Sequence, residues 1–175
     1  MTTTLTTTLI GQMPNNLIEA AQLRKIVNKL IPTLFPVQLD ILNRYIEDTK
    51  INELTNCMVS ANAARRSGTS MIAAAIALAE SRMGKSVLLL TDIKYETAIT
   101  FEKMGSFSEW GYNSLKEDTL VISHSGYSQR GNRFDVVIYE SFVKYSKNNY
   151  YNSVEEVHDR LAVDTNCSLI YTIHS

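Results

Sequence analysis

A run of small, polar and basic residues is the part of the sequence best suited to hold a phosphate group. The run Asn62–Ser70 reads NAARRSGTS and stands between a short apolar segment and an Ala-rich one. Where such a loop leads into a helix, converging backbone N–H groups and the helix dipole favour an anion. Against the phosphate-loop pattern G-x-x-x-x-G-K-[ST], Gly68 and Ser70 fit, Ala63 replaces the first glycine and Thr69 replaces the lysine. A plain turn before an Ala-rich helix accounts for the composition equally well.

Other reactive side chains form no pattern typical of a metal or disulfide site. The histidines His124, His158 and His174 lack the spacing of metal ligands. The cysteines Cys57 and Cys167 are spaced neither for zinc nor for a disulfide framework. We therefore expect two buried thiols in a reducing compartment.

A basic and aromatic cluster is a weaker candidate for binding. It comprises Lys144, Tyr145, Lys147, Tyr150 and Tyr151. Such a cluster can stack on single-stranded nucleic acid. A polar surface loop explains the same composition and is the favoured interpretation.

The segments around the phosphate-loop candidate predict a β-α-β unit. Residues 56–60 are a short apolar run, residues 71–82 are Ala-rich and helical, and residues 86–91 are a continuous apolar run typical of a buried parallel strand. Gly84 ends the helix. A unit of this kind crosses over right-handed into a parallel sheet.

The rest of the chain continues the alternation of strands and helices. Two helices precede the β-α-β unit. The first is expected at 17–31, with Asn16 as its N-cap and Pro32 ending it, and the second at 37–49. Further strands are expected at 119–123, 134–139 and 168–173, helices at 93–104 and 154–161, and loops at 105–113, 126–133 and 144–153. The sequence therefore predicts a three-layer α/β sandwich with a mostly parallel sheet of about five strands, preceded by N-terminal helices.

Composition limits the domain count and the partners. The chain has 175 residues, is 45% hydrophobic, and carries a net charge of −1 with a pI of about 6.3, so no global basic excess indicates nucleic acid. The Thr-rich segment 1–16 has no apolar face to bury and is expected to be a flexible tail, and residues 17–175 are expected to form one domain. No signal peptide or membrane span is apparent, so we expect a soluble cytoplasmic protein without a membrane partner.

Five short segments in a fixed order together resemble the ATPase domain of the large terminase subunit, the motor that packages viral DNA, and more distantly superfamily-two helicases. Both belong to the P-loop NTPases, and the resemblance spans roughly residues 32–175. The segments are PVQLDIL at 36–42, similar to P-x-Q-x-x-h-L; RRSGTS at 65–70, similar to R-x-x-G-K-[ST]; the strand at 86–92; RGNRFDVVIYES at 130–141, similar to R-G-x-x-x-D-h-h-h-h-D-E-[AS]; and the final strand at 168–175.

The resemblance implies an ATP and Mg²⁺ site with named roles. Gln38 would contact adenine, Arg65 would stabilise charge on the γ-phosphate, Glu140 would orient the attacking water, and Thr172 would couple hydrolysis to motion. The remaining nucleotide-binding positions are Arg66, Ser67, Gly68, Thr69 and Ser70, and Ser70 would also ligate Mg²⁺.

Two departures weaken the implied chemistry. Thr69 stands where the lysine is expected, and Tyr139 stands where the Mg²⁺-associated aspartate is expected. Asp135 lies about 13 Å back along the strand and does not substitute easily. Arg66 is the candidate to supply the missing positive charge.

These observations leave three hypotheses. The favoured one is a degenerate pseudo-ATPase or accessory subunit linked to viral DNA packaging or DNA processing. Such a subunit would form an oligomer with other motor or virion subunits, in the host cytoplasm or in the virion. Double-stranded DNA would be a potential partner. The second is an active but deviant ATPase in which Arg65 or Arg66 replaces the lysine. The third is a non-catalytic α/β interaction module.

Overall fold

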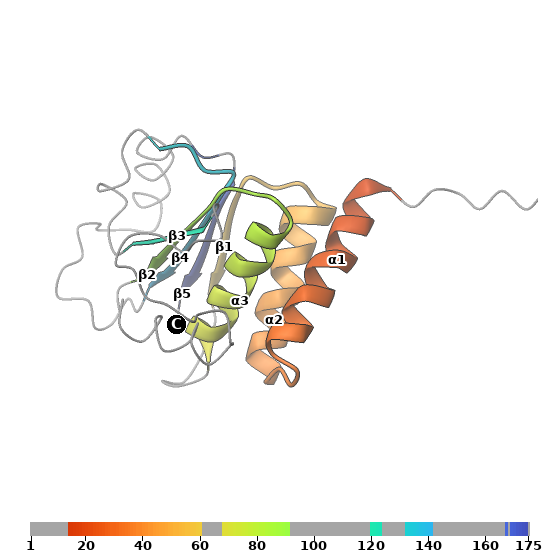
Figure 1. Ribbon diagram of the computed structural model, residues 1–175. Helices are drawn as coiled ribbons and strands as arrows, with labels where there is room; N and C mark the ends of the chain where they lie inside the picture. Colours follow the sequence, from red (N-terminus) through yellow and green to blue (C-terminus); the bar gives the residue numbers. More distant parts are fainter. Residues whose placement is uncertain are drawn as a thin grey trace, which may run out of the picture.

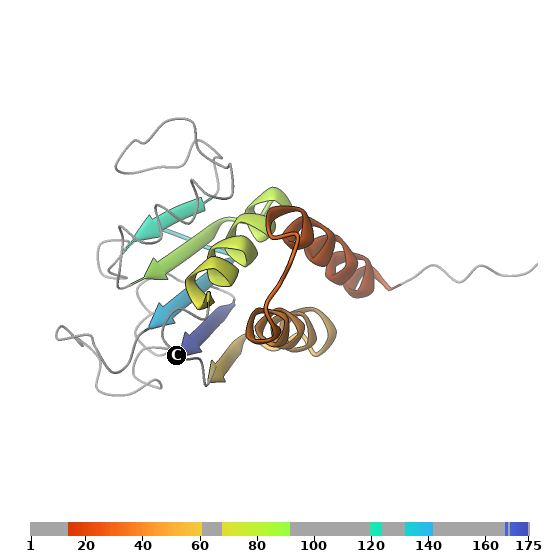
Figure 2. The same cartoon turned by 90° about the horizontal axis from the view of Figure 1, so that it is seen from below.

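The computed structural model describes residues 14–60, 68–91, 120–123, 132–141, 167 and 169–174, which form a five-stranded parallel sheet with helices packed on one side (Figure 1). The elements are α1 (Asn15–Leu30), α2 (Pro36–Ile46), the π-helical turn η1 (Glu47–Ile51), β1 (Asn56–Ser60), α3 (Thr69–Arg82), β2 (Val87–Thr91), β3 (Leu120–Ser123), β4 (Val136–Ser141) and β5 (Ile170–His174). The expected α/β class with a parallel sheet is confirmed. The described helices α1, α2 and α3 all lie on the same side of the sheet (Figure 2).

The strand order is β1-β5-β4-β2-β3, and each pair of neighbours is parallel. From β2 the chain continues to β3, which lies on one side of the β2–β4 pair, and from β4 it continues to β5, which lies on the other side of that pair. The neighbouring strands β2 and β4 are therefore a switch point, with Thr91 paired to Glu140 at their carboxyl ends. In open parallel sheets, ligands bind outside the carboxyl ends of the strands at such a point.

Alternation along β4 divides its side chains between two faces. Val136 and Ile138 join the apolar cluster that contains α3, whereas Val137 belongs to a second cluster, against which Tyr139 also packs. Because side chains alternate along a strand, Glu140 shares the α3 face with Ile138. Tyr139 therefore faces away from α3.

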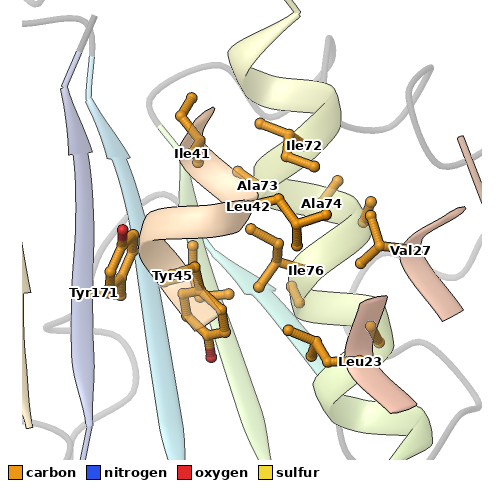
Figure 3. Packing of buried hydrophobic residues seen from close by; sticks show 14 of the residues in the cluster. Leu23, Val27, Ile41, Leu42, Tyr45, Ile72, Ala73, Ala74, Ile76 and Tyr171 are labelled. Carbon is orange, nitrogen blue, oxygen red and sulfur yellow. The ribbon is translucent and has the colours of Figure 1, made fainter. Parts of the chain in front are cut away.

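Helix α3 is buried along almost its whole length. Every residue from Ile72 to Ser81 is buried, which is why its sequence shows no amphipathic stripe. The small alanines let neighbouring elements approach closely. Leu23 and Val27 of α1 reach α3 from one side, and side chains of α2 pack between α3 and the sheet (Figure 3).

Several predicted boundaries differ from the structure. Helix α1 begins at Asn15, so Asn16 is not its N-cap; the carbonyl of Pro14 accepts the N–H groups of Leu17 and Ile18. The helix expected at 37–49 ends at Ile46 and continues as the π turn, which brings Lys50 to the interior.

Strand β4 corrects the expected strand 134–139. It spans Val136–Ser141, because parallel pairing with β2 and β5 continues through Glu140 and Ser141. Asp135 instead binds Ser86 just before the strand, through its own N–H and its carboxylate. The expected helices 93–104 and 154–161, the loops 105–113 and 144–153, most of the loop 126–133 and most of the tail 1–16 lie outside the described residues. In the part of the chain that is described, no helix has the length and apolar character to cross a membrane.

Candidate functional site

The first turn of α3 meets the carboxyl end of β4. The Ser70 hydroxyl donates a hydrogen bond to Glu140 Oε1 over 2.6 Å. Ser70 is half-buried, and Glu140 is only 2% exposed. A hydroxyl and a carboxylate held together in this way are oxygen ligands of the kind that a hard cation such as Mg²⁺ prefers. Among the described residues no cluster of three or more His, Cys, Asp or Glu side chains is placed to hold a metal ion.

The topology explains why these two residues meet. Helix α3 follows β1 at one edge of the sheet and packs across β4 and β2 on its way to β2. Its N-terminus therefore lies at the carboxyl ends of the strands. The Glu140 side chain reaches this N-terminus because it lies on the same face of β4 as Val136 and Ile138, the face that packs against α3.

Gly68 sets the entry into α3. It caps the helix with φ of +79°, a left-handed conformation that favours glycine. Its carbonyl accepts the N–H of Ile72, which is the first bond of the helix, and the side-chain amide of Gln38 over 3.0 Å. A Cβ at position 68 would overlap Gln38 Nε2, so a side chain there would require the Gln38 amide to move.

Gln38 connects the N-termini of two helices. Its Oε1 accepts the N–H of Phe35 at the start of α2 over 2.9 Å, and its Nε2 donates to Gly68 at the start of α3. The side chain is 1% exposed. Gln38 thus lies next to the first turn of α3, and each end of its amide makes a bond within the protein.

Two other predicted residues do not join the Ser70–Glu140 pair. Thr69 is 4% exposed, so its side chain is enclosed by the protein. Thr172 is fully buried in β5, paired with Tyr139 of β4. Its neighbours Tyr171 and Ile173 belong to the α3-side cluster, so Thr172 faces the opposite side of the sheet from Ser70. The predicted positions Arg65, Arg66 and Ser67 lie outside the described residues.

A buried charged cluster, not predicted from the sequence, lies at the other end of α3. Glu80 is fully buried; its Oε1 accepts a hydrogen bond from the Tyr45 hydroxyl and forms an ion pair with Lys50 Nζ, each over 2.6 Å. Lys85 Nζ lies 3.3 Å from the second oxygen of Glu80, with ionic contact but no hydrogen-bond geometry. Both lysines also lie within 4.0 Å of Glu19, an exposed residue of α1.

Burial and charge oppose each other in this cluster. Burial, followed by the charge of Glu80, raises the pKa of Tyr45 well above its ordinary value. Burial lowers the pKa of Lys50 in spite of Glu80. Burial also acts to lower the pKa of Lys85, but the charges of Glu80 and Glu19 outweigh it and raise that pKa. The cluster fastens α1, α2 and the π turn to α3, because each element contributes one of its members.

A sequence signal for this cluster exists in retrospect. Glu80 is the single charged residue between Ser70 and Arg82, inside a helix of small and apolar residues. A carboxylate at such a position has to be paired when the helix is buried.

Comparison with known proteins finds no matching family model and no curated relative, so the function is inferred from the chain's own residues and geometry.

Proposed function

We propose that the chain is a P-loop-type nucleotide-binding domain that holds Mg²⁺-nucleotide with little or no hydrolysis, as a degenerate subunit of a viral DNA-packaging or DNA-processing assembly. The contact between Ser70 and Glu140 carries the proposal. In P-loop NTPases, Mg²⁺ is held by the hydroxyl of the phosphate loop and by a carboxylate at the end of a neighbouring strand. Ser70 and Glu140 have these residue types and this relationship, at the switch point where a parallel sheet binds ligands.

The register of β4 favours a revised role for Glu140. With Arg130 and Asp135 matched to the segment R-G-x-x-x-D-h-h-h-h-D-E, the four apolar positions are 136–139, and Glu140 falls on the metal-associated carboxylate. Tyr139 faces away from α3 and fits no role beside Ser70. Ser141 then occupies the position of the carboxylate that orients the attacking water.

These substitutions support binding over hydrolysis. Phosphoryl transfer depends on neutralising charge and on positioning water. Thr69 supplies no positive charge and is enclosed by the protein, and a serine at 141 is a poor substitute for a carboxylate that orients water. The cation and the phosphate-loop backbone remain as sources of affinity.

The assembly context comes from the ordered segments that resemble the terminase ATPase domain. With a net charge of −1, the chain has no general attraction for DNA. DNA would then be held mainly by other subunits of the assembly. This part of the proposal is tested by co-purification with a motor or virion subunit, whereas the nucleotide site is tested on the chain alone.

Calorimetric titration with ATPγS and Mg²⁺ tests the nucleotide site. We expect micromolar binding that is weakened about tenfold or more by Ser70→Ala or by removing Mg²⁺ with EDTA. Ser86→Ala is the matched control, because Ser86 is also a half-buried serine but precedes β2 at the opposite end of the sheet. Hydrolysis of ATP should not exceed that of the Ser70→Ala variant.

Other outcomes separate the remaining hypotheses. Turnover of ATP that Glu140→Gln abolishes would contradict impaired hydrolysis and favour the active, deviant ATPase. Absence of binding up to millimolar nucleotide, or equal binding by wild type and Ser70→Ala, would reject the nucleotide site and favour an α/β interaction module.

A further inference from the structure

The amide of Gln38 ties the start of α2 to the start of α3. Its oxygen accepts from Phe35 N–H and its nitrogen donates to the Gly68 carbonyl, two bonds of 2.9 and 3.0 Å. The two bonded atoms of the main chain lie no more than about 8 Å apart, given the size of an amide group. One side chain therefore fixes the spacing of two helix N-termini beside the candidate site.

This arrangement conflicts with a base-reading role. The amide keeps a second N–H and a second lone pair beyond its bonds to Gly68 and Phe35, but the side chain is only 1% exposed, so a purine edge could reach them only if Gln38 moved out of its place. Such a movement would exchange the two existing bonds for new ones of similar strength, which brings little net stabilisation, and it would take Gln38 away from the part-buried Phe35 N–H and Gly68 carbonyl.

The same bonds are well placed to hold the phosphate-binding turn. Gly68 is in the left-handed conformation that directs the chain into α3, and Ser70 follows two residues later. Gln38 holds the Gly68 carbonyl and fills the space where a Cβ would lie. A change at Gln38 should therefore reach Ser70 through the first turn of the helix.

We propose that Gln38 is a positioning residue for Gly68 and Ser70 and not a base-reading residue, so that the site takes nucleoside triphosphates by their phosphates and cation without selecting adenine over guanine. The inference rests on the proposed function for its ligand. The positioning role itself rests only on the contacts of Gln38.

The first test compares ligands by calorimetry in the presence of Mg²⁺. The wild-type chain should bind ATPγS and GTPγS with affinities within about threefold of each other, which is the difference a single weak contact makes. Gln38→Met keeps the length of the side chain but removes both bonds. It should weaken ATPγS, GTPγS and inorganic tripolyphosphate by the same factor. A wild-type preference for ATPγS of about tenfold or more, lost in Gln38→Met with tripolyphosphate binding unchanged, would overturn the inference.

The second test needs no nucleotide. The Ile72 N–H bonds to the Gly68 carbonyl, so its hydrogen exchange reports on the first turn of α3. Exchange should speed up in Gln38→Met and in Gln38→Glu, which keeps an acceptor for Phe35 but loses the donor to Gly68. The Met83 N–H at the far end of α3 is the internal control and should be unchanged.

The two tests have distinguishable failures. If no phosphate ligand binds the wild-type chain, the proposed function fails, and the exchange of the Ile72 amide still decides whether Gln38 positions the turn. Unchanged exchange at Ile72 in a Gln38→Met chain with wild-type thermal stability would reject the positioning role.

Discussion

Ser70 Oγ and Glu140 Oε1 lie 2.6 Å apart although 70 positions separate the two residues in the sequence. The crossover from β1 through α3 brings the hydroxyl to the carboxyl end of β4, and the alternation of β4 turns the carboxylate towards it. This contact depends at once on the strand order, on the position of α3 and on the register of β4. A shift of one residue in β4 would replace Glu140 by Tyr139 or Ser141.

Glu140→Gln tests the charge at this contact. The amide oxygen still accepts the Ser70 hydroxyl, but the negative charge that attracts a divalent cation is gone. Nucleotide binding should therefore lose its dependence on Mg²⁺, with an affinity close to that of wild type in EDTA. Tyr139→Phe is the neighbouring control and should keep the Mg²⁺ dependence, because its side chain faces away from α3. Equal Mg²⁺ dependence in wild type and Glu140→Gln would remove Glu140 from the cation site.

Gly68→Ala tests the fit between the turn and Gln38. A left-handed alanine costs about 1–2 kcal/mol, and moving Gln38 away from its two hydrogen bonds adds about 1–3 kcal/mol. Gly84→Ala is a matched control, because Gly84 has φ of +88° but open space around its Cβ position. Urea denaturation should show the larger loss for Gly68→Ala. Combining it with Gln38→Ala should recover part of that difference, and equal losses for the two glycine variants would show that Gln38 exerts no steric constraint.

The sequence predicts the strands better than it predicts the faces of the strands. The runs at 56–60 and 86–91 are apolar and bounded by polar residues, so their positions are recognisable. Val136–Tyr139 is apolar at every position, because both faces of a buried parallel strand are covered. No alternation remains to show that Glu140 faces α3 and Tyr139 does not. The bond between Gln38 and Gly68 could not be predicted from the sequence either, because it joins residues 30 positions apart.

Two tyrosines in edge-to-face contact allow a comparison of two buried hydroxyl groups. Tyr45 and Tyr171 meet edge to face with ring centroids 4.8 Å apart. The Tyr45 hydroxyl donates to Glu80, whereas the buried Tyr171 hydroxyl has no hydrogen-bond partner among the described residues. Tyr45→Phe should lower the free energy of unfolding by about 1.5–3 kcal/mol, and Tyr171→Phe should leave it unchanged or raise it by about 1 kcal/mol. Denaturant midpoints measure both, and an equal loss in the two variants would reveal a partner for Tyr171.

Substitution of Glu80 tests whether the charged cluster stabilises the packing of α1, α2 and the π turn on α3. Glu80→Ala leaves Lys50, which is buried beside it, without its main counter-charge, and should cost about 3–5 kcal/mol. The exposed pair of Asp40 and Arg44 is the control, and Asp40→Asn should cost no more than about 1 kcal/mol. Replacing Glu80 and Lys50 together by Leu and Met should recover much of the loss, because a well-packed apolar pair avoids burying charge. A loss below about 1 kcal/mol for Glu80→Ala would show that the cluster contributes little to stability.

Cys57 gives a pH dependence with a defined sign. Burial, followed by the negative charge of Asp48, raises the pKa of its thiol from 9.0 to about 11. Between these two values the unfolded chain has lost the proton that the folded chain keeps, so stability falls as pH rises, with a slope of up to about 1.4 kcal/mol per pH unit. In a Cys167→Ser background, urea unfolding between pH 8.5 and 10 should show a steeper decline for the chain with Cys57 than for Cys57→Ala. Iodoacetamide at pH 8.5 should modify Cys57 slowly in the folded chain and rapidly in urea, because only the thiolate reacts. Rapid modification of the folded chain at that pH, together with parallel pH profiles for the two variants, would contradict the raised pKa.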